Sequence, residues 1–441
     1  MNLEEVSFEI LAKHYLCDYC LGRQFSNLAT GTTNLKRGQI IKSFLVMKIS
    51  SSDSENNIEA MQILSQSGSD LAKKFLEKKG IPSKETIDCY ICENLLLKID
   101  TLTEVIQEKI KNLEIKTFLI GTILPQEYLE REKELKEKYG IHQSEYLKQE
   151  FNRNIGKKLS EKTHLKTDFQ APEIVIETQP TSLDVHLNIS PLFIYGKYKK
   201  NIRTIPQTRW LCRKCKGKGC KECNHTGKRY DVSVEELIEY EALKATKGEK
   251  GVLHGAGRED IDARMLGSGR PFVLEIVNPK IRSIDLVELE RLTNLHAGKQ
   301  IEVQKYRFSS KGEIAHLKKS AEESIKKYRA LIIFDVPITN KDVEKIESKF
   351  HEIVLNQRTP TRVSHRRADK IRNKKVYSIQ SKIRNDREIE SIIVCDGGCY
   401  VKELISGDEG RTSPSISEII GIKAFCKELD VLEIEERPYF I

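Results

Sequence analysis

The sequence predicts an α/β fold, of the α+β type, with two regions that each bury a core of their own. Its 441 residues exceed what one hydrophobic core usually organises. Strand and helix patterns alternate along the C-terminal half, and a smaller set of such patterns precedes them. A basic, cysteine-containing stretch separates the two sets. We therefore predict a domain boundary near residue 205, with regions 1–205 and 206–441.

The N-terminal region is expected to hold an α/β module of roughly a hundred residues. Strand patterns at residues 116–122, 173–178 and 182–188 surround a charged helical segment at about 126–160. Before this module, apolar side chains recur at helical spacing over residues 58–79. This spacing predicts a helix there.

The C-terminal region alternates helices with strands and carries two long polar insertions. The insertions, residues 305–325 and 357–388, are too charged to be core, and such insertions often contact a large substrate. Helices are predicted at residues 234–246, 284–295, 341–350, 399–406 and 414–420, and strands at 273–277, 329–335 and 391–395.

The composition favours an acidic polymer as the binding partner. The formal net charge is +9, the sequence pI is about 8.8, and 32% of the residues are charged. Lysine and arginine are densest in residues 197–229 and 357–387, where they far outnumber the acids. Residues 1–15 lack the pattern of a signal peptide, and no run of about eighteen apolar residues occurs. We expect a cytoplasmic protein that binds nucleic acid, with an anionic membrane surface as the weaker alternative.

Eight of the eleven cysteines form four C-x-x-C pairs, a spacing that favours metal over disulfides in a reducing compartment. Ordinary reduced cysteines are the alternative, and an iron–sulfur cluster also suits the compact second group. Both sites are expected to be structural, because four cysteines leave no coordination position for water. The expected zinc ligands are Cys17, Cys20, Cys89 and Cys92 in one site, and Cys212, Cys215, Cys220 and Cys223 in the other.

The segment HGAGREDIDARMLGSGRPFVLEI places two acids, Asp260 and Asp262, between glycine-rich turns and before a strand. Alone this segment is ambiguous, because Asp260 could simply pair with a neighbouring arginine on a charged surface. Two further segments follow it in order. They are KKYRALIIFD, in which Tyr328 leads into a strand, and DGGCYVKELI, in which Lys402 enters a helix.

These three segments resemble the ordered motifs of pseudouridine synthases. KYKKNIRTIPQTRW, SVEELI and QRTPTRVSHRRAD add a closer resemblance to the Pus-ten family of archaeal and eukaryotic tRNA pseudouridine synthases. The N-terminal cysteine pairs and α/β module resemble that family's THUMP-like RNA-binding region. Cys399 stands where relatives often have threonine, and the four-cysteine loop is a further departure from eukaryotic members. The resemblance implies a catalytic domain with a mixed sheet.

The resemblance also implies a role for each motif residue. Asp260 is the essential aspartate and must be ionised, and Lys402 is the basic residue beside it. Tyr328 stacks on the target base, while Arg258 fills the space of the extruded base or holds a phosphate. The implied partner is tRNA, modified at T-arm uridines 54 and 55 by a monomer that needs no nucleotide or other organic cofactor. Further substrate contacts are expected from the basic residues Lys199, Lys200, Arg203, Arg362, Arg366 and Arg367.

Two other classes of protein compete with this interpretation. A THUMP-containing methyltransferase or thiolation enzyme would need a nucleotide or S-adenosylmethionine pocket, and the sequence has neither a P-loop nor G-x-G-x-x-G. A zinc-containing tRNA-binding protein without isomerase activity would use the same basic segments. Such a protein would not need Asp260.

Overall fold

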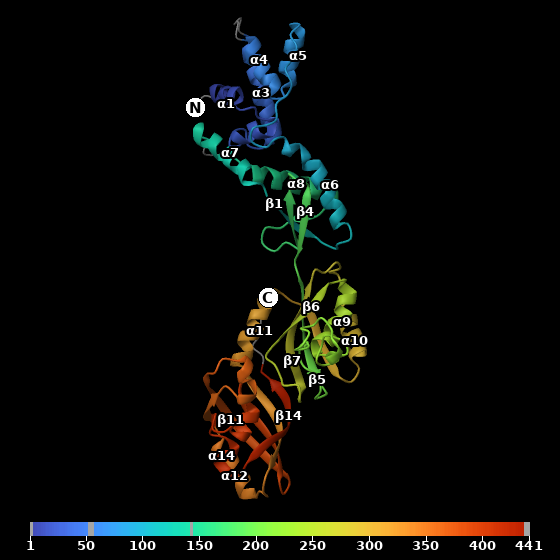
Figure 1. The fold of residues 1–441 in the computed structure, drawn as a ribbon, viewed down its shortest axis with the longest axis vertical. Coiled ribbons are helices and arrows are strands. Elements are labelled where there is room, and N and C mark those ends of the chain that lie inside the picture. The colour runs from blue at the N-terminus through green and yellow to red at the C-terminus, as the bar shows by residue number, and fades with distance from the viewer. Residues whose placement is uncertain (1–2, 52–56, 142–143, 436–441) are drawn as a thin grey trace. The chain divides into compact units, whose positions relative to one another are not determined.

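The structure, a computed structural model, describes residues 3–51, 57–141 and 144–435. It divides into two compact units, Met1–Ser190 and Pro191–Ile441 (Figure 1). The division lies before the predicted boundary at 205, because strand β5 (Leu192–Lys200) pairs with two strands of the second unit. Its many lysines make β5 look like a surface segment in the sequence, although every second residue along it faces inward.

Unit 1 contains a small sheet of order β2-β1-β3-β4, against which two of its helices, α6 and α8, pack, while its first five helices pack mainly on one another. Strand β1 is parallel to β2 and β3, whereas β4 is antiparallel to β3. The three strands predicted from the sequence are confirmed. The strands are β1 (Thr117–Thr122), β2 (Lys166–Thr167), β3 (Ile174–Gln179) and β4 (Asp184–Ile189). The helices are α1 (Leu3–Lys13), α2 (Asp18–Gln24), α3 (Asn34–Ser50), α4 (Asn57–Gln66), α5 (Asp70–Lys78), η1 (Leu95–Lys98), α6 (Ile99–Ile110), α7 (Gln126–Lys138) and α8 (Leu147–Thr163).

Each long helix predicted in unit 1 is divided in two. The helix expected over 58–79 is interrupted at Gly68, whose φ of +85° favours glycine, and the Ser69 hydroxyl then accepts a hydrogen bond from the Ala72 N–H to cap α5. The charged segment at 126–160 likewise forms α7 and α8. The helical character was correct, and the turns were missed.

Unit 2 is built on a mixed sheet of ten described strands, ordered β13-β10-β11-β12-β9-β14-β7-β5-β8, with β6 paired to β7. Long strand β7 joins the two halves of this sheet. Its C-terminal part pairs with β5 and β6, while Ala263–Met265 at its start run parallel to β14. The strands are β5 (Leu192–Lys200), β6 (Lys250–Gly255), β7 (Ala263–Val277), β8 (Ile301–Phe308), β9 (Ile325–Phe334), β10 (Ile353–Arg358), β11 (Ile371–Asn385), β12 (Glu388–Asp396), β13 (Thr412–Ser413) and β14 (Ala424–Ile434).

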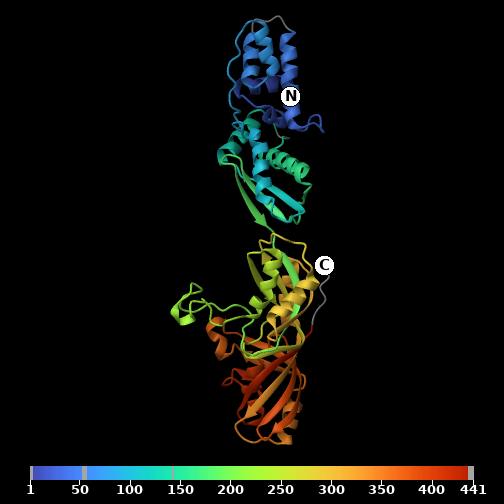
Figure 2. The same ribbon diagram turned by 90° about the vertical axis from the view of Figure 1, so that its right-hand side faces the viewer.

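The five helices predicted in unit 2 are found to within a few residues of their expected bounds, as α9 (Val234–Thr246), α10 (Leu286–Ala297), α12 (Asn340–Lys349), α13 (Val401–Ser406) and α14 (Ile416–Ile420). Three further helices were not predicted: η2 (Lys221–Cys223), α11 (Lys311–Glu323) and η3 (Thr361–Arg366). The loop that carries η2, coloured yellow-green, extends away from the sheet in Figure 2. Within the described ranges, no helix is both long and apolar enough to cross a membrane.

The two polar insertions are more ordered than their charge suggests. Residues 311–323 form α11, and residues 371–385 form β11, which lies between β10 and β12 inside the sheet. The expectation that 357–388 is wholly insertion is therefore wrong. Only Val376 and Ile379 of β11 are buried, so its apolar face is too short to be recognised by alternation.

Candidate active site

The loop Ala256–Asp262 connects β6 to the start of β7, and a buried ion pair with β7 fixes it. Arg270 on β7 donates through Nε to Glu259 at 2.8 Å and through Nη1 to the Ala256 carbonyl at 2.6 Å. The Tyr198 hydroxyl also lies 2.9 Å from a Glu259 carboxylate oxygen. The Glu259 and Arg270 side chains are 1% and 2% exposed. Because these partners hold Glu259 inward, the next residue, Asp260, is presented outward.

Lys200 adds a second anchor to this loop, and its position corrects the expectation that it contacts RNA. The residue is completely buried, and its ammonium group donates to the carbonyl oxygens of Ile205, Asp260 and Ile261 at 3.0–3.1 Å. Burial lowers the pKa of Lys200 to about 8. Side chains alternate between the two faces of β5, and that of Lys200 is on the inward face, from which it cannot reach a phosphate.

The Asp260 carboxylate lies between two cations from segments distant in sequence. Arg362 Nη1 is 3.1 Å and 2.9 Å from the two carboxylate oxygens, and Lys402 Nζ is 3.6 Å from one of them. Arg362 also donates through Nε to Glu403 at 2.6 Å. Although burial opposes the charge, the carboxylates of Glu403 and Asp260 raise the pKa of Arg362. The sequence predicted Arg362 as an RNA contact, and the structure pairs it with the aspartate.

Lys402 is closer to Asp262 than to Asp260. Its Nζ lies 2.8 Å and 2.7 Å from the Asp262 oxygens. Although partial burial opposes ionisation, the hydrogen bond from Lys402 lowers the pKa of Asp262. The Asp262 side chain is 67% exposed, compared with 31% for Asp260. Lys402 therefore bridges the two acids that the sequence presented side by side.

Tyr328 lies on β9 between β12 and β14, with Ile393 and Val431 as its cross-strand neighbours. Its side chain is almost entirely buried but lines the same cavity as Asp260. Burial, followed by the nearby Cys395 and Cys399, raises its pKa well above the ordinary value. Tyr328 therefore presents a neutral phenol ring.

A cavity of about 840 Å³ brings together all four predicted catalytic residues, Arg258, Asp260, Tyr328 and Lys402. This volume is within the range of small-ligand sites, so a single nucleotide can enter it. Its lining is strongly cationic, with only two acids. The basic lining residues are Arg258, Arg270, Lys318, Lys326, Arg362, Arg367, Arg372, Lys374 and Lys402, and the acids are Glu259 and Asp260.

The remaining predicted RNA contacts differ in how available they are. Arg367 is exposed, lines the cavity and donates to the Tyr400 hydroxyl at 3.3 Å. Lys199 pairs with Glu302 at 3.1 Å, and Arg203 pairs with Glu428 and Asp430. The side chain of Arg366 lies outside the described part of the structure.

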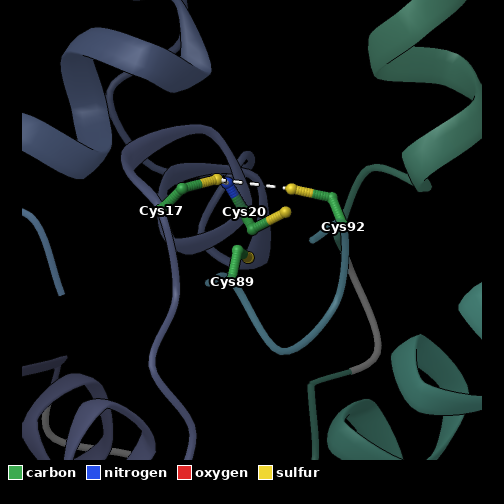
Figure 3. Close-up of side chains that lie close together, drawn as sticks. All are labelled: Cys17, Cys20, Cys89 and Cys92. Atoms are coloured by element: carbon green, nitrogen blue, oxygen red, sulfur yellow. Dashed lines mark hydrogen bonds between the residues drawn. The ribbon is translucent and has the colours of Figure 1, made fainter. Parts of the chain in front are cut away.

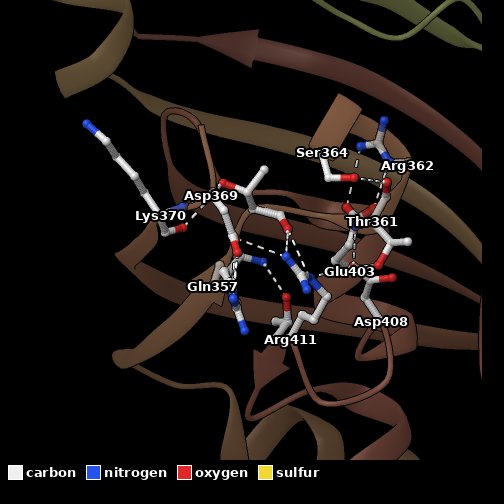
Figure 4. Close-up of polar contacts among 12 residues, drawn as sticks. Gln357, Thr361, Arg362, Ser364, Asp369, Lys370, Glu403, Asp408 and Arg411 are labelled. Atoms are coloured by element: carbon white, nitrogen blue, oxygen red, sulfur yellow. Dashed lines mark hydrogen bonds and ion pairs between the residues drawn. The ribbon is translucent and has the colours of Figure 1, made fainter. Parts of the chain in front are cut away.

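Polar contacts from neighbouring segments fix the segment that carries Arg362. The Thr361 N–H donates to Asp408 at 2.8 Å, and Arg411 donates to Asp369 at 3.0 Å. Figure 4 shows this network together with the Arg362–Glu403 pair, and it shows the Lys370 side chain extending away from the network. The network positions Arg362 while leaving other cations of the segment in solvent.

Trp210 and Arg258 add an aromatic contact beside the catalytic loop. The Arg258 guanidinium lies 5.4 Å from the centre of the Trp210 ring, a cation–π arrangement. Arg229 lies 5.2 Å from the same ring. The loop with the second cysteine group thus reaches the rim of the active site through its aromatic residue.

The four N-terminal cysteines converge although their two pairs are far apart in the sequence. Their ligand atoms lie within 4.8 Å of one another, and the sulfur atoms of Cys17 and Cys92 are 3.6 Å apart (Figure 3). Zinc–sulfur bonds of about 2.3 Å in a tetrahedron place sulfur atoms about 3.8 Å apart. The Cys20 N–H also points to the Cys17 sulfur at 3.4 Å, as in a metal-binding turn. The residues present therefore fit a tetrahedral metal ion.

The second group satisfies the same test within one loop. Sulfur atoms of Cys212 and Cys220 are 3.9 Å apart, those of Cys215 and Cys223 3.8 Å, and those of Cys220 and Cys223 3.7 Å. Backbone N–H groups of Gly219 and Gly227 donate to sulfur at 3.2 Å and 3.3 Å. Such donors stabilise thiolate, the form that binds metal. Both predicted cysteine clusters could hold metal ions.

The sequence did not reveal the residues that hold the site in place. Glu259, Arg270 and Glu403 are charged, and in a sequence such residues suggest solvent. Each is buried here and paired with another part of the site. One feature of the sequence could have pointed to a structural role for Glu259. It lies between the motif residues Arg258 and Asp260, and the resemblance gives its own side chain no catalytic role.

Comparison with known proteins finds matches over nearly the whole chain. A family profile described as "Pus10, C-terminal" matches residues 193–435, and one described as "Pus10 THUMP domain, archaeal" matches residues 102–178. A protein of Methanocaldococcus jannaschii named tRNA pseudouridine synthase Pus10 is 42% identical over 99% of this chain and 95% of its own length. The protein of the same name from Methanopyrus kandleri is 39% identical over 96% of this chain and 97% of its own length. Among solved structures, a Cbf5-Nop10-Gar1 complex matches with a TM-score of 0.29 and 15% identity over 54% of this chain and 48% of that one.

The two family profiles and the named relatives show that this is a protein of the pseudouridine synthase class. Within that class the particular family is established by the matches over nearly the whole chain. The chain belongs to the Pus10 family.

Proposed function

We propose that this protein isomerises uridine to pseudouridine in the T-arm of tRNA, at positions 54 and 55. It acts as a cytoplasmic monomer. One observation carries the proposal: the Asp260 carboxylate opens into the cavity that Tyr328 lines, with Arg362 within 2.9 Å and Lys402 at 3.6 Å. The names of the relatives, tRNA pseudouridine synthase Pus10, support tRNA as the substrate.

The reaction exchanges one bond for another within the nucleotide. The N1–C1′ bond breaks, a C5–C1′ bond forms, C5 loses its proton and N1 gains one. Asp260 can act by attacking C1′, by stabilising positive charge there, or by removing a sugar proton. The ion pair with Arg362 orients the Asp260 carboxylate for any of these routes. The backbone of the loop is held separately, by Glu259 and Lys200.

The other motif residues bind the base. The Tyr328 ring offers a planar apolar face on which a uracil can stack, and its raised pKa keeps the hydroxyl protonated. A uridine within a folded arm must first be extruded from its stack. Arg258 lines the cavity and contacts Trp210, which supports the proposal that it fills the vacated space or holds a phosphate. No organic cofactor is required for this chemistry.

Phosphate contacts come from exposed cations of residues 357–387 and from cations of the 197–229 segment. Lys199, Arg203, Arg362 and Arg367 supply candidate contacts, although the first three share their charge with acids. Each phosphate neutralised releases counterions, so binding should weaken steeply with salt. Arg366 belongs to the same proposal.

Both cysteine clusters are proposed to hold structural zinc. All four positions of each tetrahedron are protein sulfur, so the ion would stabilise its fold and leave no position for substrate. Metal analysis of carefully reduced protein should find about two ions per chain. Cys17→Ser and Cys212→Ser should each lose one ion and lower the melting temperature, with smaller loss of activity per folded molecule. Protein that binds no metal and yet melts normally contradicts the assignment.

The decisive experiment is to incubate the purified protein with one unmodified tRNA and to map pseudouridine by sequence position. We expect product at T-arm uridines. A zinc-containing tRNA-binding protein without isomerase activity would bind the tRNA and leave both uridines unchanged. That result would reject the proposed function.

A further inference from the structure

One buried lysine in the cavity has no part in the function proposed above. Lys326 lies on β9 two residues before Tyr328, so both side chains are on the same face of the strand. Only 6% of Lys326 is exposed, and it lines the same cavity as Tyr328 and Asp260. Its cross-strand neighbours, Cys395 on β12 and Ile434 on β14, offer no counterion.

Within the described residues, the Lys326 ammonium group makes no hydrogen bond or ion pair. The acid that acts on its charge, Glu259, is committed to Arg270 and Tyr198. Burial, and then the positive charge of Arg270, lowers the pKa of Lys326 to about 8. The ammonium group borders the cavity, and a cation on a side chain so largely withdrawn from water, without a protein partner, is costly for folding. Such a group persists where something else binds it.

The position of Lys326 under the catalytic loop shows which part of the substrate it meets. A Cβ atom built on Gly257, whose φ is +82°, would lie 3.2 Å from Lys326 Nζ and 3.0 Å from Arg270 Nη1. The ammonium group therefore lies directly against the loop that presents Asp260. On its own strand, the next side chain on the same face is that of Tyr328. A uracil stacked on Tyr328 would be within reach of its four-carbon side chain.

The reaction creates negative charge at that position. When the N1–C1′ bond breaks, its electron pair stays on the uracil ring and is shared among N1, O2 and O4. The ring then remains bound near the Asp260 carboxylate while it rotates to present C5. A cation that meets the developing charge in a water-poor site lowers the barrier most effectively.

We propose that Lys326 is a further catalytic residue, whose ammonium group donates a hydrogen bond to a carbonyl oxygen of the target uracil and stabilises the detached, anionic ring. The inference rests on the proposed isomerase function. Lys326 stays protonated throughout, so the overall balance remains one proton lost from C5 and one gained at N1. The same ammonium could instead bind a phosphate that flanks the target nucleotide, and the measurements below separate these two sources of negative charge.

The test compares Lys326→Met with Lys327→Met on full-length protein. Lys327 is the next residue of β9 and is exposed, so it controls for removing one lysine from this strand. The single-turnover rate at saturating enzyme, the tRNA dissociation constant and its salt dependence, and the melting temperature are measured for each. Wild-type protein provides the reference for pseudouridine formation.

We expect Lys326→Met to lower the saturating rate by about 10²–10³-fold, as for loss of one preorganised donor, with affinity little changed. Lys327→Met should keep the wild-type rate. Because methionine replaces an unpaired buried charge, the Lys326 variant should melt at or above the wild-type temperature, whereas loss of a structural lysine would lower it. The Lys326→Arg variant should retain part of the rate.

The pH dependence gives an independent measurement. At subsaturating enzyme the rate reports groups of the free protein. The groups that face Lys326 are Glu259, Arg270 on β7, Lys374 on β11, Cys395 on β12 and Lys318 on α11, with Tyr328 beside it. Since the pKa of Lys326 is about 8, the wild-type rate should fall as pH rises through that value, and Lys326→Arg should move the fall to higher pH.

Three results would overturn the inference. A wild-type saturating rate for Lys326→Met removes the catalytic role. Weaker binding with a lower salt slope but an unchanged saturating rate assigns the lysine to a phosphate. A lower melting temperature with proportionate loss of activity assigns it to the fold. If the wild-type protein itself forms no pseudouridine, the proposed function and this inference fail together, whereas each of the other results leaves the function intact.

Discussion

The catalytic loop and the segment 357–370 face the same cavity, yet they hold their charges in opposite ways. Around the loop, the Glu259–Arg270 pair is 1% and 2% exposed. In the segment, Arg358 pairs with Asp369 at 54% and 42% exposure. Breaking a buried pair leaves an uncompensated charge and is costly, whereas an exposed pair contributes little. The difference predicts that the loop keeps a fixed geometry, while the segment can exchange its partners for phosphates.

The largest effect is expected for Asp260→Asn, which keeps the shape of the side chain and removes its negative charge. Every route proposed for the reaction needs that charge, so the single-turnover rate should fall by about 10³-fold or more. Affinity for tRNA should survive, because the exposed cations are untouched. Pseudouridine yield with enzyme in excess measures the rate, and a yield near wild type would refute the catalytic assignment.

A large effect on stability should follow from Glu259→Gln. The change leaves the Arg270 guanidinium buried without its counterion and should cost about 3–5 kcal/mol of unfolding free energy. Glu302→Gln is the matched control, because Glu302 pairs with Lys199 at half exposure and should cost less than about 1 kcal/mol. Denaturant unfolding measures both. Equal costs would erase the difference between buried and exposed pairs on which the comparison rests.

The residues predicted from the sequence are those with chemistry of their own, and the missed ones are those that position them. Asp260, Tyr328 and Lys402 could be named as candidates because the resemblance supplied an ordered set of motifs, and the structure brings all three to one cavity. Glu259 and Lys200 could not, since nothing in a charged residue's identity states that it will be buried and paired. Burial of such groups depends on partners from distant strands, which local pattern does not encode.

The same reason explains which elements were predicted. Helices with helical spacing, such as α9, were found at nearly their observed bounds. Strands with one apolar face, such as β9 and β12, were also found, but each begins three or four residues before its predicted start. Most other strands of unit 2 were missed, and in β5 and β11 the reason is that lysine and arginine interrupt the alternation. The approach of Cys17 and Cys92, which are far apart in the sequence, was inferred only from the four ligands that a tetrahedral metal ion needs. A metal site needs a fixed number of ligands, so its members can be predicted even when they are far apart in the sequence. Hydrophobic periodicity predicts only local structure.

A moderate effect on binding should sharpen the comparison within the segment itself. Arg367 and Lys370 are exposed, and neither is paired with a carboxylate in the described structure, whereas Arg358 is held by Asp369. The double change Arg367→Ala with Lys370→Ala should weaken tRNA binding and reduce the salt slope by about two, one for each phosphate that is no longer neutralised. Arg358→Ala should alter the slope less. An unchanged slope in the double variant would show that these cations do not bind phosphate.

The smallest effect is expected for Asp262→Asn. Asp262 is at least as near to Lys402 as Asp260 is but more exposed, so the variant tests whether an acid matters for the reaction merely because it lies near the active site. Asp262 holds Lys402 more closely than Asp260 does, at 2.7 Å against 3.6 Å, but its side chain is 67% exposed. An ion pair so open to water is worth about 1 kcal/mol or less, which limits the change in rate to about fivefold. Lys402, once released, can move toward Asp260, and this compensates part of the loss. The single-turnover rate should therefore stay close to wild type, in contrast to Asp260→Asn at the same loop. If Asp262→Asn lost activity as completely as Asp260→Asn, the two acids would act together, and the buried anchoring of Glu259 would no longer explain why one of them is selected for chemistry.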